Sequence, residues 1–272
     1  MNNLLSEEHV AAVGRRRRVV VNFDVLIFDP AVDEDAEALA NERLTYADDP
    51  AVQIDSIWGN WSEGNVVPYP SKHLPTLEHP GYQRWLDDGI DIVRVFLEQT
   101  HKRGLEAFFS HRMNGSDADP MVVPGVGLVA DGVVREGAAA GQTAGVYKIP
   151  MKEQHPDWLF HTPWSRSGLW NFANAGVREH VLQNLREVAE DYDFDGIELD
   201  FARGIVFPEG EGWLSRDSMT TFMRDVRSVL LEVERKRGRP FLLAARVPQD
   251  LMGCHFDGLD VETWARDHLI DI

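Results

Sequence analysis

The chain contains one cysteine, Cys254, in 272 residues. A single thiol forms no disulfide within the chain and supplies no multi-cysteine metal site. His111, His155 and His161 show neither the HxH nor the HExxH spacing on which common zinc sites depend. The sequence also lacks the GxSxG elbow of serine hydrolases. We therefore expect neither a metal ion nor an organic cofactor.

Positive charge is scarce as well. The sequence has 27 Lys and Arg against 45 Asp and Glu, a formal net charge of -18. This balance argues against nucleic acid or an anionic membrane as a partner. The one basic run, Arg15 to Arg18, directly precedes an apolar segment. We interpret this run as the solvated beginning of a strand rather than as a targeting patch.

Long hydrophobic runs are missing too. No stretch of about 18 apolar residues suggests a membrane span, and residues 1–18 lack the apolar core of a signal peptide. As the sequence stands, we expect a cytoplasmic protein. A leader removed earlier would leave the same pattern, so secretion stays open.

What the sequence does have is a regular alternation of strand-like and helix-like segments. Apolar strands are predicted at residues 19–24, 52–58, 105–110, 197–201, 241–245 and 269–272. Helical periodicity is seen at residues 33–41, 81–103, 177–190, 218–236 and 261–267. Near-continuous apolar strands that alternate with helices predict a parallel sheet covered by helices.

Two features favour an α/β fold of the (β/α)8 TIM-barrel type over an open doubly wound sheet. Polar residues recur at the carboxyl ends of the predicted strands, where barrel active sites lie. No glycine-rich phosphate loop follows the first strand. The chain stops inside the sixth predicted strand, so we expect a barrel truncated after strand six. Residues 1–18 would be an extension and 19–272 the barrel domain.

One connection in this domain, residues 111–176 between the third strand and the next helix, is unusually long. Connections of this length are commonly functional lids or disordered segments. Its glycine-rich part, residues 124–145, is expected to form a flap or a small hairpin, and its aromatic part to be ordered.

The strongest functional signal is the segment 191–203, DYDFDGIELDFAR. Side chains alternate along a strand, so Glu198 and Asp200 share one face. Burying two carboxylates in an apolar strand is costly without a function, and pairs of carboxylates commonly cleave glycosidic bonds. One pKa of such a pair should be raised by the like charge, and a nearby arginine should lower the other. The alternative is a structural ion network with Arg112 or Arg246.

Other candidate site residues lie at predicted strand ends or in the loops between elements. Polar side chains there can hydrogen-bond sugar hydroxyls, and tryptophan can stack on a pyranose ring. Ordinary loop or packing roles are the alternative for each, and Asp271 is also considered as a second catalytic carboxylate. The candidates for substrate binding are Asp24, Trp58, His111, Arg112, Asn114, Trp170, Arg203, Arg246 and Asp271.

Four blocks, in this order along the chain, resemble the family 10 glycosylhydrolase-like barrel proteins. They are FSHRMN at 109–114, HPDW at 155–158, NAGVRE at 174–179 and YDFDGIELDF at 192–201. The resemblance covers residues 19–272 and implies a (β/α)8 barrel with a role in polysaccharide breakdown.

Residues 195–202 also resemble the chitinase pattern D-G-x-D-x-D-x-E, but Ala202 replaces the final glutamate, the proton donor of that family. This departure argues against chitinase chemistry. The sequence thus predicts a glycoside hydrolase with a carbohydrate substrate. Asp200 would be nucleophile or electrostatic stabiliser, and Glu198 its acid/base partner or orienting neighbour. A non-catalytic carbohydrate-binding barrel, or a barrel hydrolase or lyase with another substrate, remains an alternative.

Overall fold

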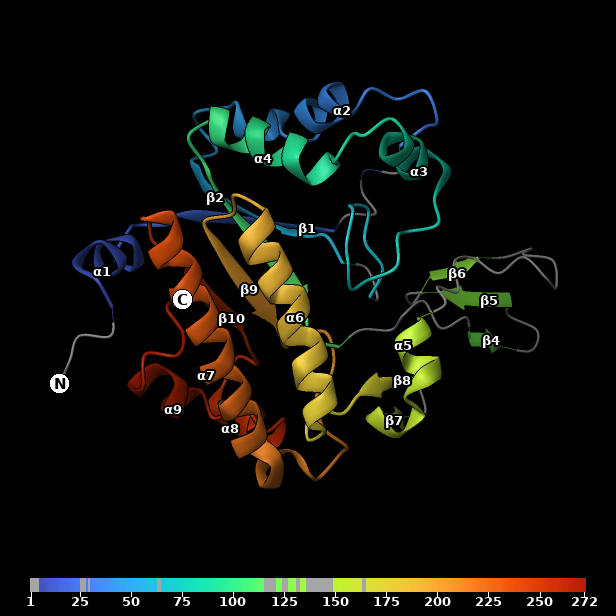
Figure 1. Ribbon diagram of the computed structural model, residues 1–272, viewed down its shortest axis with the longest axis vertical. Coiled ribbons are helices and arrows are strands. Elements are labelled where there is room, and N and C mark those ends of the chain that lie inside the picture. Colours follow the sequence, from blue (N-terminus) through green and yellow to red (C-terminus); the bar gives the residue numbers. More distant parts are fainter. Residues whose placement is uncertain are drawn as a thin grey trace.

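The computed structural model describes residues 5–24, 28, 30–62, 65–114, 121–123, 127–130, 133–135, 149–162 and 165–272 (Figure 1). Its centre is a five-stranded sheet in which every neighbouring pair is parallel. In spatial order the strands are β1 (Val19–Asp24), β2 (Ile54–Asn60), β3 (Glu106–Arg112), β9 (Gly196–Asp200) and β10 (Leu242–Arg246).

The order of these strands in space is their order along the chain. A doubly wound sheet reverses its strand order at a switch point, whereas successive barrel strands do not. The predicted α/β fold of barrel type is therefore confirmed for the part of the chain that the structure describes.

Helices cover the outer face of this sheet. Figure 1 shows α2 (Ala36–Arg43) and α4 (Ile92–Lys102) over the β1–β2 side, and α6 (Ala175–Asp191) and α7 (Gly212–Arg237) in front of β9 and β10. Outward side chains of β9, such as Ile197 and Leu199, are fully buried in the main core. None of the described helices is long and apolar enough to cross a membrane.

The local sequence explains where these helices begin and end. α6 begins at Asn174, whose side chain accepts a hydrogen bond from the amide of Gly176 at 2.8 Å. α7 ends at Gly238, whose φ of 69° lies in the left-handed region that favours glycine. The predicted single helix at 81–103 is wrong. Gly89, with a φ of 75°, and the Asp91 cap divide it into α3 (Pro80–Asp87) and α4.

The long connection after β3 contains several short elements. Two strands of its glycine-rich part, β5 (Gly127–Ala130) and β6 (Val133–Arg135), pair antiparallel, as the expected hairpin requires, and β4 (Met121–Val123), just before this part, pairs antiparallel with β5. The rest of residues 124–145 lies outside the described residues. The aromatic part holds α5 (Pro150–Gln154) and an antiparallel pair of strands, β7 (Leu159–Thr162) and β8 (Ser165–Trp170).

The remaining short elements are two 3-10 turns and two helices. Thr45–Ala47 lies between α2 and β2, Pro156–Trp158 lies between α5 and β7, and α8 (Leu251–Phe256) and α9 (Val261–Arg266) follow β10. Residues 269–272 form no assigned strand, contrary to the prediction. Two backbone hydrogen bonds still hold this segment along β10, from Asp271 N to Leu243 O at 2.8 Å and from Ala245 N to Ile272 O at 2.9 Å.

The inner face of the sheet is organised in rows, because neighbouring strands are in register. The lowest row is apolar and contains Trp58, Phe108, Gly196 and Leu242, with Asn22 at its edge. Above it lies a polar row: Asp24, Asn60, Ser110, Glu198 and Ala244. At the carboxyl ends, Arg112, Asp200 and Arg246 form the last row.

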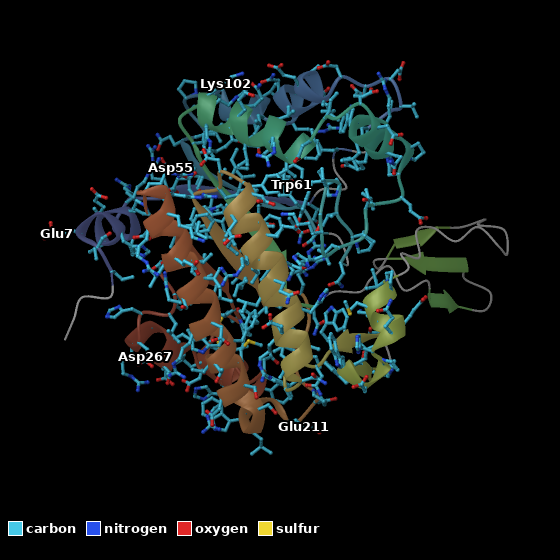
Figure 2. All side chains as sticks on the ribbon, viewed as in Figure 1. Glu7, Asp55, Trp61, Lys102, Glu211 and Asp267 are labelled. Carbon is cyan, nitrogen blue, oxygen red and sulfur yellow. The ribbon has the colours of Figure 1, made fainter. Side chains whose placement is uncertain are left out.

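The amino-terminal segment closes the other end of this inner face. Ala12 and Val13, in and beside the last turn of α1 (Glu7–Val13), pack on the cluster of Trp58, Phe108 and Leu242. Figure 2 shows Glu7 and Asp55 at this end of the molecule and Glu211 at the opposite end, where α7 begins. The rows of polar side chains therefore open toward the end where α7 starts.

Arg15, Arg16 and Arg18 of the basic run beside α1 are exposed, as predicted, whereas Arg17 is largely buried. The Arg17 side chain is 8% exposed and pairs with Glu106, with its Nε 2.7 Å from Oε2. Arg18 pairs with Asp55, its Nη2 lying 2.8 Å from Oδ1. The acidic residues that begin β2 and β3 thus hold this segment against the sheet.

Candidate active site

Glu198 and Asp200 lie together on the inner face, in the last two rows of the sheet. Each is 2% exposed, whereas Ile197, Leu199 and Phe201 are part of the main core on the other face. The i, i+2 spacing in β9 produces this arrangement because side chains alternate along a strand. Two buried carboxylates therefore lie at the carboxyl end of the sheet.

Glu198 is held mainly by neutral partners. Asn22 Nδ2 donates to Glu198 Oε2 at 3.1 Å, and the Ser110 hydroxyl donates to the same carboxyl group. Burial raises the pKa of Glu198 above its ordinary value of 4.5, and the charge of Asp200 raises it further. The hydrogen bonds and the charge of Arg246 act in the opposite direction but do not outweigh burial. Glu198 is thus suited to carry and donate a proton.

Asp200 has a different set of partners. Its Oδ1 accepts a hydrogen bond from Ala202 N at 2.9 Å, and its Oδ2 lies 3.5 Å from Arg246 Nη1. In the sheet register its neighbours on both sides are arginines, Arg112 and Arg246. The Arg246 side chain is 49% exposed, so part of this positive charge faces solvent. Two neighbouring carboxylates therefore differ in their partners: Glu198 is held by neutral groups, and Asp200 lies beside an arginine.

Arg112 and Asp24 complete this edge of the site. They form a direct ion pair, in which Arg112 Nη2 donates to Asp24 Oδ1. The arginine side chain is 9% exposed and the aspartate 40% exposed. This pair, from β3 and β1, stands beside the carboxylates of β9.

Asn60 is a site residue that sequence reasoning missed. It is 1% exposed and lies in the same row as Glu198. Its Oδ1 accepts from Ser62 N at 3.2 Å, but its Nδ2 has no partner among the described residues. The predicted second strand, residues 52–58, does not reach Asn60. The structure extends β2 to Asn60, and alternation from Trp58 then places both on the inner face.

Trp58 lies beneath the site rather than beside it. Its ring stacks on Phe108, with centroids 4.8 Å apart and planes 19° apart. Its Nε1 donates to Ser56 Oγ at 2.7 Å, and the residue is 8% exposed. Trp58 therefore packs in the apolar row beneath the polar side chains.

Asn114 and Trp170 hold the surrounding segments together. Asn114 Nδ2 donates to the carbonyls of Trp170 and Ile205, and its Oδ1 accepts from Trp170 N, each at 2.9 Å. Trp170 is 1% exposed, and its Nε1 donates to Asn65 Oδ1 at 3.0 Å. These partners occupy the Asn114 amide and enclose the indole, so both residues support the loops around the site.

His111 lies on the helix-covered face of the sheet, away from the carboxylates. It pairs in register with Leu199 and is 5% exposed, and its Nδ1 lies 3.4 Å from Ser62 Oγ. Burial, and to a lesser extent His180, lowers the pKa of His111 to about 4. Its imidazole is therefore neutral at physiological pH.

Asp271 lies apart from the carboxylate pair, and among the described residues Arg203 makes no contact with that pair that would place it in the site. Asp271 is buried near α1, where it contacts His9 Nε2 at 3.1 Å and Arg227 Nη1 at 2.9 Å. Arg203, just after β9, is exposed and forms no ion pair with the described residues. Within the described residues no group of three His, Cys, Asp or Glu is arranged to hold a metal ion.

The chain has low overall similarity to several solved glycoside hydrolases. One is alpha-L-fucosidase isoenzyme 2 from Paenibacillus thiaminolyticus, with 15% identity, a TM-score of 0.49, and coverage of 88% of this chain and 34% of that chain. A maltogenic alpha-amylase from Thermotoga neapolitana has 14% identity and a TM-score of 0.47, covering 92% of this chain and 50% of that one. A family 18 N-acetylglucosaminidase from Paenibacillus barengoltzii has 12% identity and a TM-score of 0.46, covering 94% and 52%.

The chain thus spans between about a third and a half of the length of these three structures. No protein-family model matches the chain, and no curated protein matches it. At these identities, and with TM-scores below 0.5, the similarities establish neither a family nor an activity. The resemblance to the family 10 glycosylhydrolase-like proteins stays a prediction.

Proposed function

We propose that this protein is a glycoside hydrolase that acts on an oligo- or polysaccharide. The observation that carries the proposal is the pair of buried carboxylates, Glu198 and Asp200, on one face at the carboxyl end of β9. Carboxylate pairs in this position perform acid/base and nucleophilic chemistry on glycosidic bonds.

The two carboxylates differ in a way that assigns their roles. Glu198, with its raised pKa, is the proton donor to the oxygen of the leaving group. Asp200, held by Ala202 N and Arg246, stabilises the positive charge that develops on the sugar, or attacks the anomeric carbon. Residues i and i+2 of a strand are about 7 Å apart, and this spacing leaves both the retaining and the inverting outcome open.

Neighbouring polar side chains orient these groups and the substrate. Asn22 and Ser110 fix the Glu198 carboxyl group. Asn60 Nδ2, which pairs with none of the described residues, and the half-exposed guanidinium of Arg246 provide donors for sugar hydroxyls. A sugar bound across the last two rows would meet the Asn60 and Arg246 donors together with both carboxylates.

The test is the exchange of each carboxylate for its amide. Glu198→Gln and Asp200→Asn should each reduce the release of reducing ends from a panel of polysaccharides by at least about 100-fold. The Tm should change little, because each amide retains the size of the acid. Asp55→Asn is the matched control, since Asp55 pairs with Arg18 at the opposite end of the sheet and should leave turnover unchanged.

A second candidate function is carbohydrate binding without catalysis. The ion pairs of Arg112 with Asp24 and of Arg246 with Asp200 favour it, since they also fit a structural network. In that case no polysaccharide of the panel releases reducing ends. The amide variants would then lower the Tm instead of a rate.

A further inference from the structure

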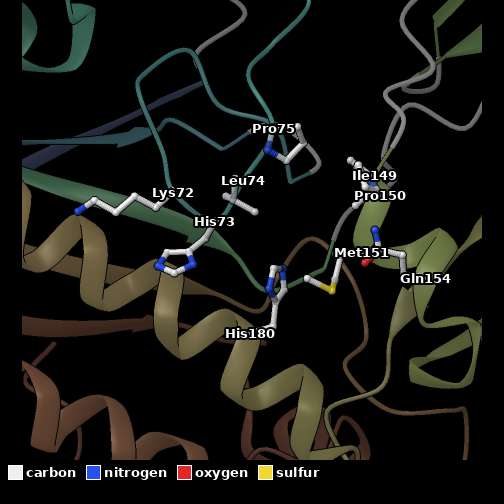
Figure 3. Close-up of a pocket in the computed structure, with 9 residues that line it drawn as sticks. All are labelled: Lys72, His73, Leu74, Pro75, Ile149, Pro150, Met151, Gln154 and His180. Carbon is white, nitrogen blue, oxygen red and sulfur yellow. The ribbon is translucent and has the colours of Figure 1, made fainter.

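A separate cavity lies outside the carboxylate rows, between the loop that precedes α3, the start of α5 and the second turn of α6 (Figure 3). Its volume is about 290 Å³. Leu74 and Pro75 line it from the loop, Ile149, Pro150 and Met151 from the start of α5, and His180 from α6. Neither Glu198 nor Asp200 contributes to its wall.

His180 gives this cavity a polar centre. The residue is 6% exposed, and its Nε2 has no hydrogen-bond partner among the described residues. Figure 3 shows its ring between His73 and Met151, below Leu74. A buried polar nitrogen without a partner loses the hydrogen bond it would make with water and destabilises the fold. A molecule that pairs with this nitrogen would replace that hydrogen bond.

The charge state of the cavity limits what it can bind. Burial, and then the neighbouring His73 and His155, lowers the pKa of His180 to about 4, so this ring is neutral at physiological pH. Lys72 directs its ammonium group away from the cavity and pairs with Asp191, Nζ to Oδ2, at 3.1 Å. With the lysine engaged and the buried histidine neutral, the cavity is suited to a neutral molecule rather than an anion.

The lining residues and the volume of the cavity indicate the polarity and the size of its ligand. Five of the lining side chains are apolar, and the volume is near the lower limit of small-molecule pockets, about 300 Å³. A neutral imidazole nitrogen either accepts or donates one hydrogen bond, according to its tautomer, and a hydroxyl group can satisfy both cases. We propose that this cavity binds a small, neutral, mostly apolar ring compound whose hydroxyl group hydrogen-bonds to His180 Nε2.

Phenol is a suitable probe, since it is an apolar ring with one hydroxyl group. Isothermal titration of the full chain should show saturable binding of one phenol. His180→Phe keeps an aromatic ring but removes the nitrogen, and it should weaken binding by about tenfold, the loss expected for one hydrogen bond. His161→Phe is the matched control, because His161 is an exposed histidine on β7 outside this cavity.

A second variant and a second readout guard against indirect effects. Met151→Trp should fill the cavity and abolish phenol binding, while leaving α5 in place. In nitrogen NMR of the ring, the His180 Nε2 resonance should shift on phenol addition in the wild type and in His161→Phe. The proposal is overturned if the wild type shows no saturable binding, or if His180→Phe and Met151→Trp bind phenol as the wild type does. Neither readout depends on glycosidase activity.

Discussion

The sheet carries a buried cluster of charges at each of its two ends, and the two clusters are built differently. Near α1, His9, Glu234, Asp271 and Arg227 form close contacts, with His9 Nδ1 2.6 Å from Glu234 Oε2 and Arg227 Nη1 2.9 Å from Asp271 Oδ2. At the carboxyl ends, the contact between Arg246 and Asp200 is looser, at 3.5 Å.

Both ends keep buried donors without a partner among the described residues, Arg227 Nε and Nη2 near α1 and Asn60 Nδ2 at the carboxyl ends, so the difference lies in how their carboxylates are held. Glu198 is held by the neutral groups of Asn22 and Ser110, and Asn60 Nδ2 has no partner among the described residues. A buried network that serves stability pairs its charges closely, whereas a site must keep donors and acceptors for a ligand. The closer charge contacts near α1 therefore indicate a role in stability there, and the looser contact of Asp200 with Arg246 indicates a role in chemistry at the carboxyl ends.

The largest expected difference between the two ends is in stability. Arg227→Met leaves Asp271 buried with less compensation, and breaking a buried ion pair in this way typically costs about 3–5 kcal/mol. Arg246→Met should cost far less, because the Arg246 side chain is half exposed and Asp200 keeps its bond to Ala202 N. Urea unfolding of both variants measures the difference. Equal losses of unfolding free energy in the two variants would show that the ion pairs at the two ends contribute equally to stability.

A control on the same helix separates the loss of an ion pair from the loss of any arginine. Arg224 pairs with Asp267 on the surface, with side chains 52% and 39% exposed. Solvent screens such a pair, so Arg224→Met should change the unfolding free energy only slightly. A large effect of Arg224→Met would mean that helix α7 itself is sensitive to these substitutions.

The pH dependence of stability offers a second, smaller contrast. Burial lowers the pKa of His9, but the hydrogen bonds and charges of Asp271 and Glu234 outweigh it and raise the pKa above 6.5. The folded state then binds this proton more tightly than the unfolded state. The stabilisation is therefore fully present below pH 6.5 and is lost as the pH rises through the raised pKa.

Glu198 should act in the same direction but in a lower pH window. Its raised pKa means that its protonated form favours the folded state, so its contribution is present below pH 4.5 and declines as the pH rises above it. Each unit of pKa shift corresponds to about 1.4 kcal/mol. We expect the unfolding free energy, measured from pH 4 to 9, to fall once through the pKa of Glu198 and again through the pKa of His9. The fall at higher pH should be absent from His9→Gln, and the fall at lower pH should be absent from Glu198→Gln. A fall that persists in its own variant would contradict this assignment.

Much of this arrangement is predictable from the sequence, because strand alternation depends only on position. The i, i+2 rule places Glu198 and Asp200 on one face without any knowledge of the fold. His111 shows the limit, since the predicted strand stopped at residue 110. β3 in fact continues to Arg112, and the same rule then directs Arg112 inward and His111 outward.

Asp271 shows a different limit. Its sequence position, near the end of a strand-like segment, resembles that of Asp200. Its partners, His9 and Arg227, are distant in the chain and come together only when α1 and α7 pack against β10. Local pattern therefore locates candidate carboxylates, but it does not determine which of them are neutralised by distant segments.

The smallest expected effect concerns Asn60 and tests whether its side-chain amide serves a ligand. Asn60→Ala removes a buried Nδ2 that pairs with none of the described residues, so the cost in unfolding free energy should be modest. It should come mainly from the lost bond between Ser62 N and Asn60 Oδ1. On a polysaccharide that the wild type cleaves, KM should rise several-fold with kcat nearly unchanged, as one hydrogen bond to bound sugar is lost. Asn41→Ala is the control, since Asn41 lies on α2, away from the carboxylates, and its amide bonds to Glu37 O and to Arg103 Nη1 at the end of α4. If Asn60→Ala lowers stability strongly and leaves KM unchanged, Asn60 has a structural role. The functional difference between the two ends of the sheet would then rest on Glu198 and Asp200 alone.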